Sequence, residues 1–254
     1  MTASRLLVVE NDPSDDARRL GRWLAEAGLE LVTLRPHAGD ALPSTLDGWD
    51  GVLVMGGGQD AYPAPDGTPA AWWYPALIDL LITAVTTRVP TLGICLGGQL
   101  LVQAMGGKVE PSRNGPEVGA FLVARRDAAA RDPLFAGVPF TPDVYQWHVD
   151  EISRLPPGAV LLAAASNMPH QAFRIGERAW GTQFHIECDL DMLTAWAADD
   201  HGLLDEYGVD ADAMLARCAA VLDDVEDAWR PFAERFAALV RGLQGSMPLP
   251  VIEA

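Results

Sequence analysis

The sequence predicts an α/β fold with a mostly parallel central sheet, and three observations lead to that prediction. Residues 5–9, 29–34, 51–55 and 91–94 are short runs rich in leucine and β-branched side chains, as buried parallel strands are. Segments with helical spacing follow three of these runs. Strands that alternate with helices are typical of βαβ units, in which helices cover both faces of the sheet.

The first half of the chain gives the boundaries of these units. Residues 11–14 are a turn cluster that is able to cap a helix, and apolar residues then recur at helical spacing over 15–28. The run at 51–55 ends in three glycines at 56–58, and a mostly apolar helix is expected over 76–87. Since chemistry gathers at the carboxyl ends of parallel strands, the glycines are expected at the functional edge of the sheet.

From residue 108 onward, short apolar runs separated by turns indicate antiparallel strands that extend the sheet. These runs are 118–124, 144–147, 160–165, 171–175 and 179–184. Helical spacing returns over 190–198, and 211–243 reads as one or two amphipathic helices, with Pro231 at a kink or in the first turn of the second. We expect one domain over residues 1–200, with residues 201–254 as a C-terminal helical extension packed on that domain.

Composition narrows the class of protein. The formal net charge of the 254 residues is -17 and no basic patch interrupts it, so nucleic acid is not an expected partner. No apolar stretch reaches the ~18 residues of a membrane span, and the N-terminal residues lack the apolar region of a signal peptide. Three cysteines make an odd, sparse set, which favours a reducing compartment. We expect a cytoplasmic protein without membrane contact.

Cys95 lies where the strand at 91–94 stops and a helix begins. The letters GICLG at 93–97 have the form of a nucleophile elbow, G-x-S-x-G, with cysteine in place of serine. The two glycines leave room for a sharp turn, and the helix N-terminus favours the thiolate. The N–H of Leu96 is then aimed at an oxyanion. A lone elbow also occurs as a structural glycine-rich turn, so a catalytic role needs partners elsewhere in the chain.

Suitable partners follow the last predicted strand. In the segment QFHIE at 183–187, His185 and Glu187 are two apart and can point to the same side. A cysteine nucleophile needs an imidazole to take its proton and to protonate the leaving amine, and the imidazole needs a carboxylate to fix its tautomer. Without Cys95, a core histidine and a solvated glutamate would be the simpler interpretation. Together the three side chains predict a Cys-His-Glu triad.

These motifs carry a resemblance to a known family. The segments GICLGGQLL around Cys95, MGGG at 55–58 and QFHIE at 183–187 are similar to class I glutamine amidotransferases in order and spacing. GPE at 115–117 and YQWHVD at 145–150 further resemble the stand-alone branch that is similar to the amidotransferase domain of GMP synthase. The resemblance implies a flavodoxin-like three-layer sandwich with a mostly parallel sheet, an antiparallel extension and a C-terminal helical tail.

The resemblance also implies a reaction. Cys95 would attack the side-chain amide carbon of glutamine, ammonia would leave with a proton from His185, and water would hydrolyse the γ-glutamyl thioester. The oxyanion would be held by the N–H of Leu96 and a backbone N–H of Gly57 or Gly58, where the lack of a Cβ lets the chain approach the substrate. The residues that match the family's glutamine pocket are Gln99, Trp147, His148, Val149 and Asp150.

One residue departs from the family pattern. The family commonly has His-Pro-Glu, whereas Ile186 replaces the proline here, which keeps the spacing but not the rigidity. An inactive binding or regulatory subunit is therefore one alternative function. Hydrolysis of larger γ-glutamyl peptides or amides is another, because the same triad would serve it. The ammonia of an amidotransferase would pass to a separate synthetase chain or be released, since the sequence has no phosphate-binding loop motif.

No cofactor and no metal are expected. His148, Asp150, His185 and Cys188 could be read as a metal set, but two irregular pairs lack the ligand spacing of a zinc site.

Overall fold

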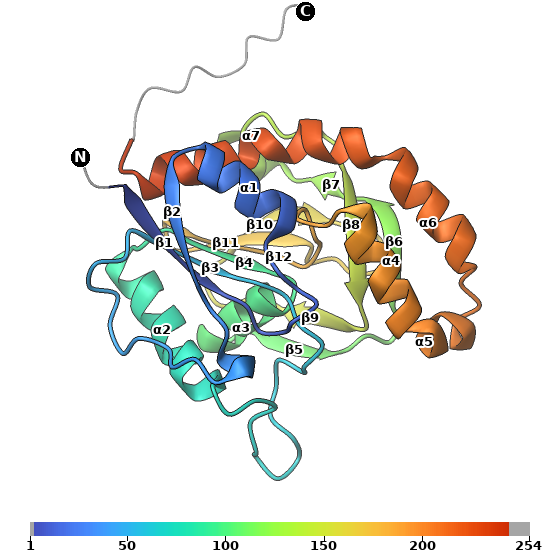
Figure 1. The fold of residues 1–254 in the computed structure, drawn as a ribbon, viewed down its shortest axis with the longest axis horizontal. Coiled ribbons are helices and arrows are strands. Elements are labelled where there is room, and N and C mark those ends of the chain that lie inside the picture. The colour runs from blue at the N-terminus through green and yellow to red at the C-terminus, as the bar shows by residue number, and fades with distance from the viewer. Residues whose placement is uncertain (1–2, 244–254) are drawn as a thin grey trace, which may run out of the picture.

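The computed structural model describes residues 3–243 and has an eight-stranded mixed sheet between two helical layers (Figure 1). The strand order is β2-β1-β3-β4-β12-β11-β10-β7. The strands of this sheet are β1 (Ser4–Val9), β2 (Leu29–Leu34), β3 (Gly51–Val54), β4 (Thr91–Ile94), β7 (Ala124–Arg125), β10 (Val160–Ala164), β11 (Ala172–Ile175) and β12 (Ala179–Thr182). The first five in this order are parallel and the last three are antiparallel, so the predicted α/β three-layer fold is confirmed.

Helices cover both faces of the sheet because apolar side chains alternate along its strands. Helices α2 (Tyr74–Thr87) and α3 (Leu96–Ala104) share a buried cluster with Leu7 and Val9 of β1. Helices α1 (Arg18–Glu26) and α7 (Leu222–Val240) share another with Leu6 and Val8. Figure 1 shows the two helical layers on opposite sides of the strands. The remaining helices are α4 (Leu190–Asp199), α5 (His201–Glu206), α6 (Ala211–Ala220) and the short 3-10 helices η1 (Pro36–Ala38) and η2 (Asp127–Arg131).

Three neighbouring parallel strands end together at one edge of the sheet. Val54 of β3 pairs with Gly93 of β4, and Ile94 of β4 pairs with Thr182 of β12. The segments that leave these strands, 55–58, 95–99 and 183–187, therefore emerge side by side. This register brings sequence-distant motifs to one place.

The antiparallel extension is smaller than the sequence indicated. Two predicted strands, at 118–124 and 144–147, do not extend the sheet as a pair. Strand β6 (Glu117–Leu122) instead pairs with β8 (Asp143–His148) in a separate two-stranded sheet. Only β7, the end of the first run, joins the main sheet. A further pair, β5 (Lys108–Pro111) and β9 (Asp150–Arg154), was not predicted.

The turn cluster at 11–14 does not cap helix α1, which corrects another expectation. The helix begins at Arg18, and its N-cap Ala17 has no side chain to accept a hydrogen bond. The side chain of Asn11 is used elsewhere, because its amide donates to the carbonyl of Met55 at 2.8 Å and its oxygen accepts from the indole of Trp73 at 3.0 Å. The cluster thus ties the end of β1 to the glycine loop after β3.

The helical tail packs on the body of the molecule. Trp229, Phe232 and Phe236 of α7 are fully buried in the cluster that contains β1 and α1, and Arg19 of α1 forms a 2.7 Å ion pair with Glu226. Pro231 lies inside α7, so the boundary between α6 and α7 is at Val221 and not at the proline. The division at residue 200 stays a prediction, and its last part, 244–254, lies outside the described residues.

Among the described residues, no helix combines the length and the apolar character needed to cross a membrane.

Candidate active site

Cys95 occupies a strained turn between β4 and α3. Its φ is 48° and its ψ is -110°, a backbone conformation that residues other than glycine rarely adopt. The turn is fixed on both sides, because the N–H of Cys95 donates to the carbonyl of Thr182 at 2.8 Å and its own carbonyl accepts from the N–H of Gln99 at 2.9 Å. The thiol therefore stands at the N-terminus of α3, where backbone N–H groups are unpaired.

Two glycines make this turn possible. A Cβ at Gly93 would lie 2.5 Å from the carbonyl oxygen of Gly97, and a Cβ at Gly97 would lie 2.1 Å from the carbonyl oxygen of Val54. Both contacts are with backbone, which has no flexible end to move aside. The steric role expected for the two glycines is confirmed.

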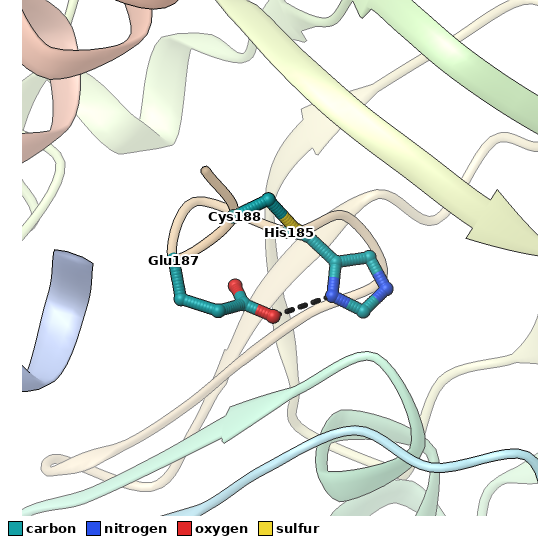
Figure 2. Close-up of side chains that lie close together, drawn as sticks. All are labelled: His185, Glu187 and Cys188. Carbon is teal, nitrogen blue, oxygen red and sulfur yellow. Dashed lines mark hydrogen bonds and ion pairs between the residues drawn. The ribbon is translucent and has the colours of Figure 1, made fainter. Parts of the chain in front are cut away.

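His185 and Glu187 meet in a buried corner after β12. Nδ1 of His185 lies 2.6 Å from Oε1 of Glu187, an interaction drawn in Figure 2. The backbone of His185 is held by two hydrogen bonds to Tyr145 of β8, at 2.8 and 3.2 Å. The carboxylate thus accepts a hydrogen bond from Nδ1–H, and Nε2 on the other side of the ring faces away from it. This is the orientation that a general base needs.

Ile186 does more here than hold the spacing. Its N–H donates to Oε2 of Glu187 at 2.9 Å, while Oε1 serves His185. A proline at this position has no N–H to give. Ile186 therefore positions the Glu187 carboxylate through a backbone hydrogen bond, whereas a proline would restrict the backbone through its ring.

The imidazole of His185 has a raised pKa and a free nitrogen. Burial by itself lowers the pKa of His185, but the negative charges of Glu187 and of a Cys95 thiolate outweigh burial and hold the pKa well above its ordinary value. Nε2 is buried and has no hydrogen-bond partner among residues 3–243. A protonated Nε2–H at this place is able to deliver a proton to a leaving group.

The sequence did not single out Gln183 as a site residue, although it is the first residue of the QFHIE segment. Its side-chain N–H donates to the sulfur of Cys95 at 3.7 Å, and its oxygen accepts from the amide of Gln99 at 3.2 Å. Gln99, expected to hold glutamine, is therefore buried and engaged with Gln183.

Two hollows meet at Cys95. The first, which we call the α3 hollow, has a volume of about 200 Å³. Its lining includes eight of the residues predicted for the site: Gly57, Gly58, Cys95, Gln99, Trp147, His148, Val149 and Asp150. Leu96 is the first residue of α3 and is buried next to Cys95, so its N–H belongs to the unpaired first turn. The predicted oxyanion and substrate residues are thus gathered around one thiol.

The second hollow, which we call the α4 hollow, has a volume of about 160 Å³ and opens beside His185. It is lined by Cys95, His185, Gly57, Gly58, Trp147 and residues that the sequence did not point to: Asp12, Ser14, Asp15, Trp196, Asp199 and Asp200. These residues come from the loop after β1 and from the junction of α4 and α5. Sequence motifs gave no signal for them, because they reach the site only through tertiary packing.

Asp15 is the buried carboxyl group of this second set of residues. Burial, opposed by His185 and reinforced by Glu187, raises the pKa of Asp15 to about 7. Gly56 packs against both, because a Cβ at Gly56 would lie 2.7 Å from Oδ1 of Asp15 and 3.2 Å from Cε1 of His185. The carboxyl group of Asp15 is thus a close neighbour of the imidazole.

Donor atoms of His185, Glu187 and Cys188 lie within 4.8 Å of one another, and Figure 2 shows the three side chains on one loop. Nδ1 of His185 is already bonded to Glu187. Burial and the nearby charge of Glu187 raise the pKa of Cys188 well above its ordinary value. A cysteine binds a metal as the thiolate, so this raised pKa disfavours Cys188 as a metal ligand. The donor set fits an oriented imidazole better than a metal centre.

His148 is also occupied. Its Nδ1 bonds the carbonyl of Asp150 at 2.8 Å and its Nε2 bonds Gln146 at 2.9 Å. The ring therefore holds the β8–β9 turn in the wall of the α3 hollow, and both nitrogens are taken.

Comparison with known proteins assigns the family. The model of the glutamine amidotransferase class-I family matches residues 17–193, well over half of the chain and including all three residues of the predicted triad. The chain therefore belongs to the class I glutamine amidotransferase family. A crystal structure of a glutamine amidotransferase from Methylobacillus flagellatus has the same fold, with a TM-score of 0.79, 26% identity, and coverage of 97% of this chain and 98% of that chain.

Three curated relatives show the range of the family around this chain. A glutamine amidotransferase-like protein of Salmonella typhimurium is 32% identical over 74% of this chain and 78% of its own length. A glutamine-hydrolysing GMP synthase of Porphyromonas gingivalis is 33% identical over 58% of this chain but only 26% of its own length. Gamma-glutamyl peptidase 4 of Arabidopsis thaliana is 29% identical over 58% of this chain and 57% of its own length.

Proposed function

We propose that this chain hydrolyses the side-chain amide of glutamine, or of a larger γ-glutamyl amide, with Cys95 as nucleophile, His185 as general acid and base, and Glu187 as the group that orients His185. The observation that carries the proposal is the arrangement around one hollow. A cysteine in a strained elbow and an unpaired buried Nε2 line the same cavity, and the other ring nitrogen lies 2.6 Å from a carboxylate. This arrangement supports acyl transfer through a thioester.

The reaction follows from these positions. The Cys95 thiolate forms a bond to the amide carbon, and the C–N bond breaks as Nε2–H of His185 protonates the leaving nitrogen. Water then attacks the γ-glutamyl thioester while His185 takes its proton, and the C–S bond breaks, which releases glutamate and restores the Cys95 thiolate and the protonated His185. The N–H groups of Leu96 and of Gly57 or Gly58 stabilise the oxyanion in both steps.

The γ-glutamyl group is assigned to the α3 hollow. Gln99, Trp147, His148, Val149 and Asp150 surround it, as the resemblance to the family implies. Asp150, whose pKa is raised mainly by burial, accepts a hydrogen bond from Tyr62 at 3.2 Å and lines the same hollow. No cofactor enters this mechanism.

The fate of the ammonia distinguishes two activities. Relatives named as GMP synthases support transfer to a separate synthetase chain, which we propose as the partner if glutamine is the substrate. The α4 hollow supports the second candidate, hydrolysis of larger γ-glutamyl amides, because ammonia alone does not need a cavity of about 160 Å³. A relative named gamma-glutamyl peptidase is consistent with it.

Steady-state release of ammonia from glutamine, and of amine from γ-glutamyl amides, tests the proposal. We expect turnover by the wild type and by Cys218→Ala, whose thiol is buried in α6, and none by Cys95→Ala. Absence of turnover for every γ-glutamyl compound would favour the inactive regulatory subunit instead.

A further inference from the structure

We propose that the substrate is a γ-glutamyl amide whose leaving amine carries a second, positively charged nitrogen, as the amide of a diamine or polyamine does. The inference rests on the proposed function and names its substrate class. It depends on which hollow receives the leaving group and on what lines that hollow.

His185 decides which hollow receives the leaving group. The leaving nitrogen must take its proton from Nε2 of His185, so the leaving group lies on the side of the sulfur where the ring is exposed to the cavity. His185 lines the α4 hollow and does not line the α3 hollow, whereas Cys95 lines both. His185 is 1% exposed, and its Nε2 has no partner within the described residues. The acyl group therefore occupies the α3 hollow and the amine departs into the α4 hollow.

The walls of the α4 hollow are rich in aspartate side chains and include no lysine or arginine from the part of the chain that the structure describes, although Asp15, with a pKa raised to about 7, is only partly ionised at neutral pH. Among the described residues, His185 is the one basic side chain that lines the hollow. Four carboxyl groups line it: Asp12, Asp15, Asp199 and Asp200. Within residues 3–243 none of the four forms an ion pair, and the nearby Arg18 is engaged by Asp16 at 2.8 Å and Asp189 at 3.5 Å. A cation in this hollow would supply the missing counter-charge.

Two indole rings add a second feature that suits a cation. Trp147 and Trp196 line the hollow with ring centroids 5.5 Å apart, and Trp196 also packs 5.0 Å from the ring of His185. The indole N–H of Trp147 donates to Asp200 at 2.7 Å and that of Trp196 to the carbonyl of Ser14 at 3.1 Å, so both rings are fixed. Fixed indole rings attract an alkylammonium group and pack against its methylene chain.

Most of the charged and aromatic side chains of the α4 hollow lie outside the stretch that the family model matches. The family model matches residues 17–193, which includes Cys95 and His185. The four aspartates and Trp196 lie outside that match. Cys95 and His185 thus lie within the family match, whereas the four aspartates and one of the two indoles lie outside it, where a determinant of substrate choice is free to differ between relatives.

The test compares leaving groups of similar length and different charge. The full chain is assayed with glutamine and with the γ-glutamyl amides of 1,4-diaminobutane (cationic), n-pentylamine (neutral) and 4-aminobutyrate (anionic). We expect kcat/KM for the cationic amide to exceed that for the neutral amide by about tenfold and that for the anionic amide by about a hundredfold. The preference should shrink as salt is added.

Substitutions at Asp199, whose side chain forms no hydrogen bond within residues 3–243, tie the preference to the hollow. Asp199→Asn should reduce the ratio of cationic to neutral kcat/KM about fivefold, and Asp199→Lys should reduce the ratio of cationic to anionic kcat/KM further. Asp191→Asn, which removes an exposed carboxylate from the same helix α4, should leave both ratios unchanged.

Each outcome is decisive. Equal or better turnover of the neutral amide, a preference for glutamine over all three amides, or unchanged ratios in the Asp199 variants would overturn this inference and leave the proposed function standing. No turnover of any of the four compounds would overturn both.

Discussion

The two corners of the site are fixed by different means. At the Cys95 corner, only backbone groups set the geometry, through close packing and two main-chain hydrogen bonds: φ is 48°, and a Cβ at Gly97 would lie 2.1 Å from a carbonyl oxygen. At the His185 corner, hydrogen bonds set it: one from Ile186 N–H to Glu187, one between Nδ1 and the same carboxylate, and two to Tyr145.

The Cys95 corner is therefore rigid, whereas the His185 corner is able to accommodate substitutions. A corner held by close backbone contacts has one solution, so glycine is required at fixed positions. A corner held by hydrogen bonds accepts another residue when the bonds can be rearranged, and Ile186 is an example. We expect substitutions at the first corner to affect folding and those at the second to affect catalysis.

The largest effect is expected from Glu187→Gln. The amide fills the same space but removes the charge that holds the pKa of His185 above its ordinary value, and burial then lowers that pKa. The preferred tautomer is lost as well, so kcat should fall about a thousandfold, measured with the best γ-glutamyl substrate over a range of pH. Glu177→Gln, an exposed partner of Arg88, is the control and should be unaffected. A loss below about tenfold would show that Glu187 does not orient the base.

Gly97→Ala should act on folding. The added Cβ collides with the carbonyl of Val54, so we expect the free energy of unfolding to drop by about 3 kcal/mol or more, measured by urea denaturation. Gly202→Ala in α5 is the matched control, because no atom lies within 4 Å of its added Cβ. That variant should be slightly more stable, by about 0.5 kcal/mol. Equal stability of the two variants would contradict the steric account of the elbow.

Asp15→Asn should change how stability depends on pH. Burial raises the pKa of Asp15 from 3.8 to about 7, so the folded protein binds this proton more tightly than the unfolded chain. The wild type therefore loses stability as pH rises from about 4 to about 7, by on the order of 2 to 4 kcal/mol, and the variant lacks this loss. Thermal unfolding of both proteins over this range measures the difference, which should grow with pH. A constant difference would show that Asp15 does not titrate with this pKa.

Ile186→Pro should have the smallest effect. It restores the ring common in the family but removes the N–H that Glu187 accepts, which costs about 1 to 3 kcal/mol for a buried charged acceptor. Rigidity offsets part of this cost, so we expect kcat to fall about tenfold relative to Ile186→Val, which keeps the N–H. A proline variant as active as the valine variant would mean that the hydrogen bond does not position the carboxylate.

The parallel strands could be predicted from the sequence because each is a short apolar run between breakers. Strands β2 and β4 match their predicted bounds, and β1 begins one residue early. The β6–β8 pair could not be predicted, because the apolar pattern of a strand does not identify its partner. The start of α1 at Arg18 was missed for a similar reason, since the side chain of Asn11 serves Met55 and Trp73 instead of capping the helix.

The site divides in the same way. Cys95, His185 and Glu187 were found because each lies in a local motif at a strand end. Gln183 lay within such a motif, but its contact with the sulfur depends on the pairing of β4 with β12. Asp199 follows no motif and reaches the α4 hollow only because α4 packs beside the catalytic loop. Residues within local motifs can therefore be picked out from the sequence, and residues that reach the site only through tertiary packing cannot.

The most direct test of the account is covalent labelling with a diazoketone analogue of glutamine, followed by intact mass and peptide mapping. The account predicts one adduct per chain, on Cys95, in the wild type and in Cys188→Ala, and none in Cys95→Ala. An adduct on Cys188, or folded wild type that takes up no label, would contradict the assignment of Cys95 as the nucleophile.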